Sequence, residues 1–178
     1  MNVVAVKQKY ARIRGIYIGL GSNIENPVVQ IKNAIKALNE LSESKVLINS
    51  GYFKSKPMGP KDQPDYVNAV VEIETTLSAD ELLKKCQLIE QSQGRVKKRH
   101  WGERIIDIDI LLYADQQIKT DDLSVPHPGI SSRDFVYMPL LKVNPEIQVP
   151  GKGLLKTIVE SASEKNTDFA CQFAGNIE

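Results

Sequence analysis

Two aspartates, Asp107 and Asp109, lie one residue apart in the apolar stretch 105–112. If this stretch is a strand, its side chains alternate between two faces, so both carboxylates point to the same side. A rise of ~3.3 Å per residue puts their Cα atoms about 6.6 Å apart, near enough to share two metal ions roughly 3.5–4 Å from each other. Magnesium, which carboxylates and substrate phosphates usually hold together, is the ion that this pair predicts, although a strand with an acidic solvent face explains the pair equally well. The expected apolar face of the strand consists of Ile106, Ile108, Ile110 and Leu112.

A cationic segment comes directly before the two aspartates. Residues 95–104 contain five Lys or Arg and one acid, whereas residues 105–115 contain three acids and no base. Arginine binds phosphate oxygens through two parallel hydrogen bonds and lysine adds a compact charge, so this segment could neutralise a polyphosphate from the side opposite the metal. A solvated charged loop is the alternative. The five cations are Arg95, Lys97, Lys98, Arg99 and Arg104.

Length, charge and cysteine content limit the classes of protein. The chain has 178 residues, typical of one domain, and a net charge of +1 at pH 7, so it lacks the overall positive charge with which many proteins bind nucleic acid. Its two cysteines, Cys86 and Cys171, have no metal-ligand spacing and favour free thiols in a reducing compartment, here the cytoplasm. Because we find no run of 18 apolar residues and no signal peptide, we expect no membrane partner.

The order of the expected elements predicts the fold. In chain order, the pattern predicts a strand over 16–20, a helix beginning at Pro27 with Asn26 as its cap, strands over 46–53 and 66–75, a helix from the capping box 78–81 to about residue 92, and strand 105–112. Strand, helix, strand, strand, helix, strand is the order of a ferredoxin-like α+β domain, an antiparallel sheet covered by helices.

Shorter elements are expected after the aspartate strand. They are a hairpin over 113–119, a rigid turn over 125–129, a short helix that begins at Ser131 or Ser132 and is ended or distorted by Pro139, and a last helix over 154–159. We therefore divide the chain into an N-terminal extension, residues 1–14, a main domain, residues 15–160, and a C-terminal tail, residues 161–178.

Polar and aromatic side chains indicate a second binding surface. Tyr66 and Asn68 share one face of the third expected strand, from which a ring could stack on a flat heterocycle and an amide could hydrogen-bond to it. The preceding connection 54–65, with three prolines and a glycine, is longer than a turn requires. Gln87 and Glu90 share a helix face from which both could reach the cationic segment. An ordinary solvated surface is the alternative for each of them.

The common nucleotide-binding motifs are missing. The chain has neither Gly-x-x-x-x-Gly-Lys-Ser/Thr nor a dinucleotide Gly-x-Gly-x-x-Gly after the first strand, and the protein-kinase motifs are absent. Its two histidines allow no convincing Ser-His-Asp or Cys-His arrangement, and zinc-ligand spacing is lacking. A bound nucleotide would therefore be held by side chains and metal ions.

Four motifs carry a resemblance to a known family. They are YIGLGSN at 17–23, GPKDQPDYVNA at 59–69, the segment from Gly94-Arg95 through WGERIIDIDIL at 101–111, and VPH at 125–127. In this order they resemble the 6-hydroxymethyl-7,8-dihydropterin pyrophosphokinase family, the folate-pathway enzymes that move a diphosphate from ATP to a pterin alcohol. The similarity covers about residues 15–150.

The resemblance implies a role for each matching side chain. Asp107 and Asp109 would hold two magnesium ions on the phosphates of ATP, and Arg95 and Arg104 would complete the catalytic set. The residues implied for ATP are Gln87, Glu90, Arg95, Lys97, His100, Trp101, Arg104, Ile110, His127 and Arg133. Those implied for the pterin are Gly21, Ser55, Pro57, Met58, Tyr66, Asn68, Trp101, Asp107 and Phe135.

Four positions depart from the family pattern. His100 replaces a usual arginine, Glu103 replaces a proline, Lys97 stands where arginine is common, and Pro128 stands where an aromatic residue often occurs. The aspartate pair is unaffected, so the changes concern the contribution of each cation in the segment.

The predicted function is an ATP- and Mg²⁺-dependent transfer of a diphosphate to 6-hydroxymethyl-7,8-dihydropterin, with release of AMP, by a monomer that acts on small molecules. Two other classes stay open at this point. Ferredoxin-like sheets with basic loops and exposed aromatic residues bind single-stranded RNA, so a small RNA-binding domain is the main alternative and a metal-dependent nuclease a weaker one. The small net charge and the aspartate pair favour the enzyme, with no nucleic acid as its partner.

Overall fold

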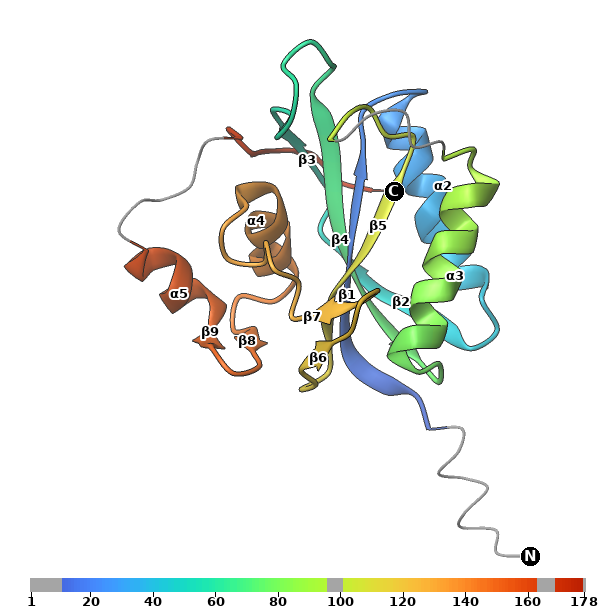
Figure 1. Ribbon diagram of the computed structural model, residues 1–178, viewed down its shortest axis with the longest axis vertical. Helices are drawn as coiled ribbons and strands as arrows, with labels where there is room; N and C mark the ends of the chain where they lie inside the picture. Colours follow the sequence, from blue (N-terminus) through green and yellow to red (C-terminus); the bar gives the residue numbers. More distant parts are fainter. Residues whose placement is uncertain (1–10, 96–100, 163–168, 178) are drawn as a thin grey trace, which may run out of the picture.

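The structure is a computed structural model and describes residues 11–95, 101–162 and 169–177. A sheet lies between two layers of helices, with α2 and α3 on one face and α4, flanked by α5, on the other (Figure 1). The elements are β1 (Ile13–Ser22), α2 (Pro27–Glu40), β2 (Ser44–Asn49), β3 (Tyr52–Ser55), β4 (Tyr66–Thr75), α3 (Ala79–Ser92), β5 (Asp107–Tyr113), β6 (Ile118–Lys119), β7 (Ser124–Val125), α4 (Asp134–Val143), β8 (Gln148–Val149), β9 (Gly153–Leu154), α5 (Leu155–Ser161) and β10 (Gln172–Gly175).

The central sheet has the strand order β5-β1-β4, and β2 and β3 pair in succession along the other edge of β4. All of these pairings are antiparallel, which confirms the predicted α+β fold with an antiparallel, ferredoxin-like sheet covered by helices. The strand expected over 46–53 is interrupted at Gly51, which has a φ of 75° that favours glycine. A Cβ there would lie 2.5 Å from the carbonyl oxygen of Gly175, so a larger residue would also clash with the C-terminal strand.

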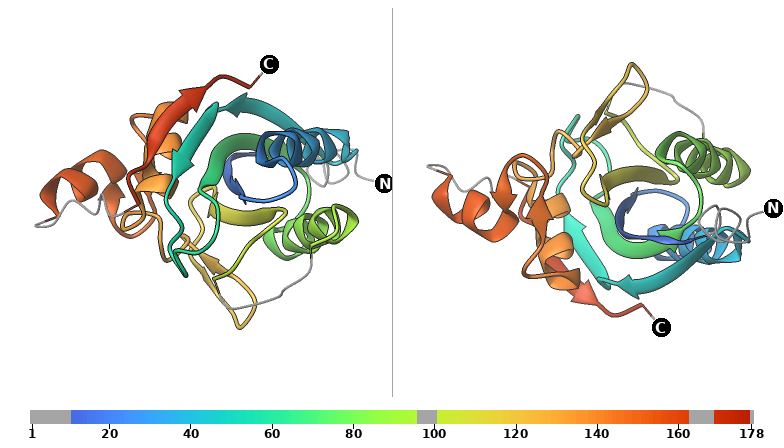
Figure 2. Two further views of the ribbon diagram at one scale, coloured as in Figure 1. Left: turned by 90° about the horizontal axis from the view of Figure 1, so that it is seen from above. Right: turned by 90° about the horizontal axis from the view of Figure 1, so that it is seen from below.

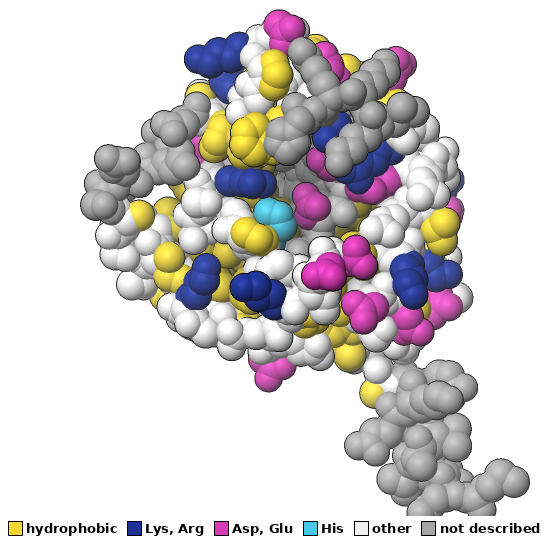
Figure 3. Space-filling view, viewed as in Figure 1, with side chains coloured by type: hydrophobic (Ala, Val, Ile, Leu, Met, Phe, Trp, Pro, Cys, Tyr) yellow, Lys and Arg dark blue, Asp and Glu magenta, His cyan; other side chains and the backbone are white. Residues whose placement is uncertain are grey.

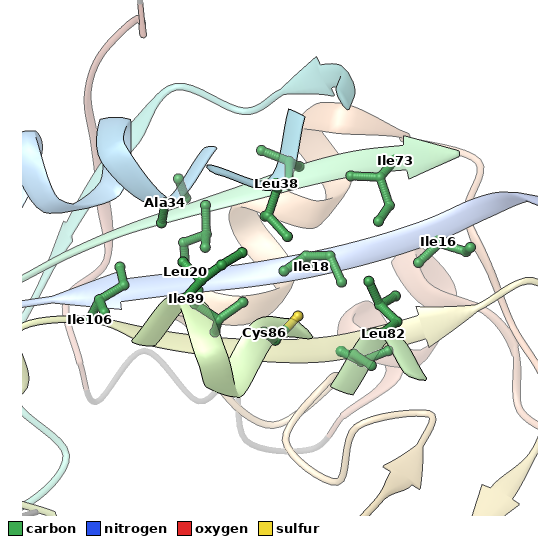
Figure 4. Packing of buried hydrophobic residues seen from close by; sticks show 14 of the residues in the cluster. Ile16, Ile18, Leu20, Ala34, Leu38, Ile73, Leu82, Cys86, Ile89 and Ile106 are labelled. Atoms are coloured by element: carbon green, nitrogen blue, oxygen red, sulfur yellow. The ribbon is translucent and has the colours of Figure 1, made fainter. Parts of the chain in front are cut away.

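The face covered by α2 and α3 contains the larger hydrophobic core (Figure 4). Side chains of β1 lie between the apolar stripes of the two helices, and residues such as Ile18, Leu38 and Leu82 are completely buried. The stripes recur every three to four residues, so each helix places one apolar side on the sheet.

The two helices of this face begin where predicted, but only α3 is capped as predicted. In α3 the Ser78 hydroxyl accepts a hydrogen bond from Glu81 N, and the Glu81 carboxylate accepts one from Ser78 N. In α2, Pro27 is the first residue, but Asn26 has a left-handed φ of 60° and its side chain makes no capping hydrogen bond. Asn26 therefore occupies the predicted cap position, but the expected side-chain cap was wrong, because a capping side chain reaches the first turn from extended backbone.

A β-bulge at Leu111 changes the faces of the residues that follow it. Leu111 is an extra residue between two successive pairs that join β5 to β1. Ile106, Ile108 and Ile110 lie in the core beneath α2 and α3, here called the first core, as predicted. Leu112 instead packs in the second core, on the face beneath α4. The prediction for Leu112 was wrong because strict alternation fails at a bulge.

The elements after β5 differ in part from the prediction. The hairpin expected over 113–119 is wrong, since β6 pairs with β7 and not with β5. Helix α4 begins at Asp134 with Arg133 as its N-terminal cap position, later than Ser131 or Ser132, and it continues through Pro139. The last helix is confirmed as α5. In the described residues, no helix has the length and apolar character needed to cross a membrane.

The C-terminal residues return to the sheet. Strand β10 pairs antiparallel with β3, with Gln172 opposite Lys54 (Figure 2). Sequence analysis gave no strand there, because the four residues of β10 become a strand only through their pairing with β3. The division of the chain at residues 14 and 160 stays a prediction.

Candidate active site

A cleft opens on the second face of the sheet, beside the N-terminal end of α4. Figure 3 shows this hollow with acidic, basic and histidine side chains around it. Strands β1, β4 and β5 form its floor. The lining residues are Gly19, Leu20, Gly21, Ser55, Lys56, Met58, Gly59, Tyr66, Asn68, Ala69, Val70, Trp101, Gly102, Arg104, Asp107, Asp109, Leu111, His127, Arg133, Phe135 and Val136.

Asp107 and Asp109 both line the cleft from β5, as the alternation predicted. Their pairing partners on β1 are Gly21 and Gly19, respectively. Because glycine has no side chain, the neighbouring strand leaves open the space beside the two carboxylates. A Cβ at Gly19 would lie 3.2 Å from a methyl group of Leu111, which is tighter than ordinary packing.

Two arginines neutralise Asp107. A terminal nitrogen of Arg95 lies 2.5 Å from Asp107 Oδ1, and Arg104 Nε lies 3.8 Å from Oδ2. Arg95 also pairs with Glu90, whose other carboxylate oxygen accepts a hydrogen bond of 2.7 Å from the backbone N of Ile108. Glu90 is 4% exposed, so it is a buried support that fixes Arg95 against β5.

Loss of surrounding water and the nearby charges act in opposite directions on the aspartates. The low hydration inside the cleft raises the pKa of both Asp107 and Asp109, although Arg95 acts to lower it. The mutual repulsion of the carboxylates adds to the rise at Asp107. Both groups still reach solvent, since the side chain of Asp107 is 34% exposed and Asp109 is exposed. Added positive charge would therefore stabilise the pair in its ionised form.

The donor set of this pair suits magnesium. Among the described residues, no three His, Cys, Asp or Glu side chains group together as a possible metal site. Two carboxylates are nevertheless sufficient for Mg²⁺, because this ion keeps several waters and takes further oxygens from substrate phosphates. The guanidinium of Arg95 already marks Asp107 as a carboxylate that holds a cation.

The opposite end of the cleft combines an amide with aromatic rings. Asn68 is 5% exposed, and its amide nitrogen donates to Ser55 Oγ at 2.9 Å. The Tyr66 hydroxyl donates to the carbonyl of Gly102 at 2.8 Å, and burial together with the charge of Asp107 raises the pKa of Tyr66 to about 12. Tyr66 therefore stays neutral and serves as a ring surface and a hydrogen-bond donor.

A buried amide pair joins the loops on either side of this end. Asn23 Nδ2 donates to Gln63 Oε1 at 3.0 Å, and its Oδ1 accepts from the backbone N of Arg104 at 2.8 Å. Gln63 donates in turn to the carbonyl of Trp101 at 2.9 Å. A Cβ at Gly59 would lie 2.4 Å from that same carbonyl, so glycine allows the loops to touch. Loop 56–65 and residues 101–104 are thus held as one wall.

His127 is held in its neutral form. The Val125–Pro126 peptide bond before it is cis, and the backbone N of His127 donates to Leu111 O at 2.9 Å. His127 Nδ1 accepts a hydrogen bond of 3.0 Å from Gly129 N, which an imidazolium cannot do. Burial and the charge of Arg133 lower the pKa of His127 to about 4. At neutral pH the ring can accept at Nδ1 and donate at Nε2.

The structure brings most of the predicted site residues to this cleft. Those that line it are Gly21, Ser55, Met58, Tyr66, Asn68, Trp101, Arg104, Asp107, Asp109, His127, Arg133 and Phe135. Glu90 and Arg95 reach it through Asp107. Lys97 and His100 lie outside the described residues.

Three further predicted residues neither line the cleft nor contact Asp107 in the structure. Gln87 is exposed on α3, the side chain of Ile110 lies in the first core, and Pro57 only neighbours lining residues. Ile110 is turned inward by the same alternation that exposes the aspartates.

Sequence reasoning assigned no role to Gly19, Asn23 or Gln63. All three lie within the motifs noted above, but their functions depend on strand register and on contacts between distant loops.

The comparisons with known proteins agree with this geometry. Residues 17–145 match the family model described as 7,8-dihydro-6-hydroxymethylpterin-pyrophosphokinase (HPPK). The chain belongs to this family. It is 45% identical over 148 residues to the 2-amino-4-hydroxy-6-hydroxymethyldihydropteridine pyrophosphokinase of Haemophilus influenzae, covering 83% of this chain and 92% of that protein. The protein of the same description from Pseudomonas aeruginosa is 40% identical over 138 residues, covering 78% of this chain and 85% of that one.

Solved structures show the same fold. A crystal structure of HPPK-DHPS in complex with substrates has a TM-score of 0.65 at 13% identity, over 89% of this chain and 45% of that one. Wild-type Plasmodium falciparum HPPK-DHPS has a TM-score of 0.63 at 14% identity, over 89% of this chain and 46% of that one. The HPPK-family chain described here therefore spans less than half the length of these two chains.

Proposed function

We propose that this protein transfers the diphosphate of ATP to 6-hydroxymethyl-7,8-dihydropterin, releases AMP and thereby serves folate biosynthesis. Family membership supports the reaction class. The observation that carries the proposal is that Asp107 and Asp109 line the same cleft as Asn68, on neighbouring strands of its floor. One end suits a metal-bound polyphosphate and the other a flat heterocycle. The RNA-binding alternative has no comparable support, and we do not retain it.

Asp107 and Asp109 are the residues that would hold magnesium, as two ions. When bound, the metal supplies charge neutralisation for the phosphates of ATP. Arg104 borders the same space, and Arg95 is oriented by Glu90, so two guanidiniums face the group that would be transferred. Their fork-shaped donors match phosphate oxygens and would balance the negative charge of the diphosphate.

The remaining charged and polar residues would position ATP. His127 and Arg133 line the cleft, and neutral His127 is a hydrogen-bond donor through Nε2. Trp101, which is 52% exposed, offers a ring at the entrance. The set that the family resemblance implies for the nucleotide is completed by Gln87, Lys97, His100 and Ile110.

The amide and the rings would hold the pterin. In this proposal its flat ring lies between Tyr66 and Phe135, and Asn68 reads its polar edge. Gly21, Ser55, Pro57 and Met58 complete the pocket. The hydroxymethyl oxygen would then attack the β-phosphorus of ATP in line and expel AMP. Because neither Tyr66 nor any other described residue at this end is an obvious base, catalysis is mainly positioning.

The product nucleotide tests the reaction. The protein is incubated with ATP, Mg²⁺ and 6-hydroxymethyl-7,8-dihydropterin, and the nucleotides are separated by chromatography. We expect AMP and the pterin diphosphate in equal amounts, and neither product when EDTA removes the metal. ADP as the product would indicate transfer of a single phosphoryl group and would refute the proposal. That the enzyme is a cytoplasmic monomer stays a prediction, which the buried free thiols of Cys86 and Cys171 support only as to compartment.

A further inference from the structure

Residues 169–177, the last described segment, contact β3 and the first turn of α4. They lie beyond residues 17–145, which match the family model. Strand β10 runs along the outer edge of β3, and the residues before it reach the beginning of α4 (Figure 2). Both β3 and α4 contribute side chains to the cleft.

Phe169 contacts two cleft-lining residues, Phe135 and Lys56. Its ring packs edge-to-face against the ring of Phe135, with centroids 5.0 Å apart and an interplanar angle of 78°. Its carbonyl oxygen accepts a hydrogen bond of 2.7 Å from the backbone N of Lys56. Phe135 and Lys56 both line the cleft, so Phe169 contacts one aromatic ring and one stretch of backbone at its border.

Contacts on the far side of the segment anchor it. The backbone N of Cys171 donates to Asp134 Oδ2 at 3.1 Å, and Asp134 is 1% exposed. Phe173 packs edge-to-face on Phe53 at 5.4 Å, and the ammonium of Lys142 lies 3.1 Å from the Phe173 ring centroid. Since neither Phe173 nor Phe53 lines the cleft, this part of the segment is an attachment and not a wall.

We propose that residues 169–177 are a positioning segment for the pterin end of the cleft, with Phe169 as the positioning residue that holds Phe135. The inference rests on the proposed function, in which Phe135 stacks on the pterin. A ring held in place loses less side-chain freedom when a ligand stacks on it, so pre-positioning strengthens binding of that ligand alone. The contacts of Phe169 are with Phe135 and Lys56, and not with the aspartates and arginines described at the nucleotide end.

The test compares Phe169→Ala with Phe173→Ala. Binding of the pterin is measured by calorimetry in the presence of Mg²⁺ and α,β-methylene-ATP, and binding of the nucleotide analogue is measured separately. An aromatic pair contributes about 0.5–1.5 kcal/mol, so Phe169→Ala should weaken pterin binding about 2- to 12-fold. We expect Phe169→Ala to bind the nucleotide within about twofold of wild type and Phe169→Tyr to bind the pterin normally. Phe173→Ala should change neither affinity, because the backbone pairing of β10 with β3 and the bond from Cys171 N to Asp134 still attach the segment.

Each other outcome overturns the inference. Unchanged pterin binding by Phe169→Ala shows that Phe135 needs no support. If Phe169→Ala weakens pterin and nucleotide binding equally, the effect is a general structural one. If Phe173→Ala weakens pterin binding as much as Phe169→Ala does, the effect comes from attachment of the segment and not from the contact between Phe169 and Phe135. Wild-type protein that binds no pterin refutes the proposed function itself, which distinguishes that failure from failure of the positioning role.

Discussion

The two faces of the central sheet are built from the same strands but are covered differently. On one face, α2 and α3 seal side chains such as Ile18 and Ile108 into a continuous core. On the other face, α4 covers only part of the strands, and the uncovered part carries Asn68, Asp107 and Asp109. Adjacent residues such as Ile108 and Asp109 therefore have opposite surroundings.

The residues that stabilise the fold therefore lie on one face of the sheet, and those proposed for the reaction lie on the other. Because successive side chains on a strand point to opposite faces, one strand can supply the core and the site without conflict. Substitutions on the sealed face should act on the free energy of unfolding, and substitutions on the open face should act on turnover. Each of the following predictions tests this separation.

The largest expected effect is on the open face. If the proposed function is right, Asp109→Asn removes a metal ligand and should lower turnover about 10²- to 10³-fold. The melting temperature should stay near that of wild type, because Asp109 is exposed. Steady-state kinetics at saturating Mg²⁺ and a thermal melt check both parts. Near-normal turnover would refute the metal assignment of Asp109.

The sealed face should respond in the opposite way. Leu82 is completely buried in α3, so Leu82→Ala leaves a cavity and should reduce the free energy of unfolding by about 3 kcal/mol. Urea denaturation measures this loss, and turnover per folded molecule at low temperature should match wild type. A large fall in turnover without a fall in stability would break the separation.

His127 gives the open face a pH-dependent contribution to stability. Its folded-state pKa of about 4 lies below the ordinary value of 6.5, so the unfolded state binds more protons between these values. The stability that neutral His127 contributes is therefore present above pH 6.5 and is lost as pH falls toward 4. NMR titration should show the imidazole neutral at pH 5. His127→Asn should lose less stability than wild type between pH 7 and pH 5, and an equal loss in both proteins would contradict the assignment.

The smallest effect is expected at the capping box of α3. Ser78→Ala removes the hydroxyl that accepts from Glu81 N and should cost about 1 kcal/mol of unfolding free energy. Turnover should be unchanged, because the box lies at the first turn of α3, whereas Glu90, which pairs with Arg95, lies in its last turn. Asp80→Ala, in the same first turn but outside the box, is the matched control and should cost less. Equal losses would show that the box adds nothing beyond a favourable first turn.

The sequence was most informative where local periodicity determines structure. The starts of α2 and α3 and the alternation around Asp107 depend on residues within one turn or one strand, and these predictions were confirmed. The shared face of Tyr66 and Asn68 followed from the same rule. The family resemblance added His127 and Arg133 to the predicted site, because no helical or strand periodicity connects these two residues with the aspartates.

What sequence reasoning missed depends on contacts between distant residues. The bulge at Leu111 exists only relative to β1, so alternation gave Leu112 the wrong face. The bond between Asn23 and Gln63 joins residues 40 positions apart, and β10 is defined by its pairing with β3. None of these features leaves a local pattern.

The glycines of β1 have one further consequence. At Gly19 and Gly21 the base of the cavity is bare peptide, which has no rotamers to adjust when molecules of different size enter. A bulkier guest must then be accommodated at the rim, residues 56–65 and 101–104, whose side chains can change rotamer although Asn23 and Gln63 tie the backbones together. Inhibitors that exploit size should accordingly be extended toward that rim and kept flat against the peptide base.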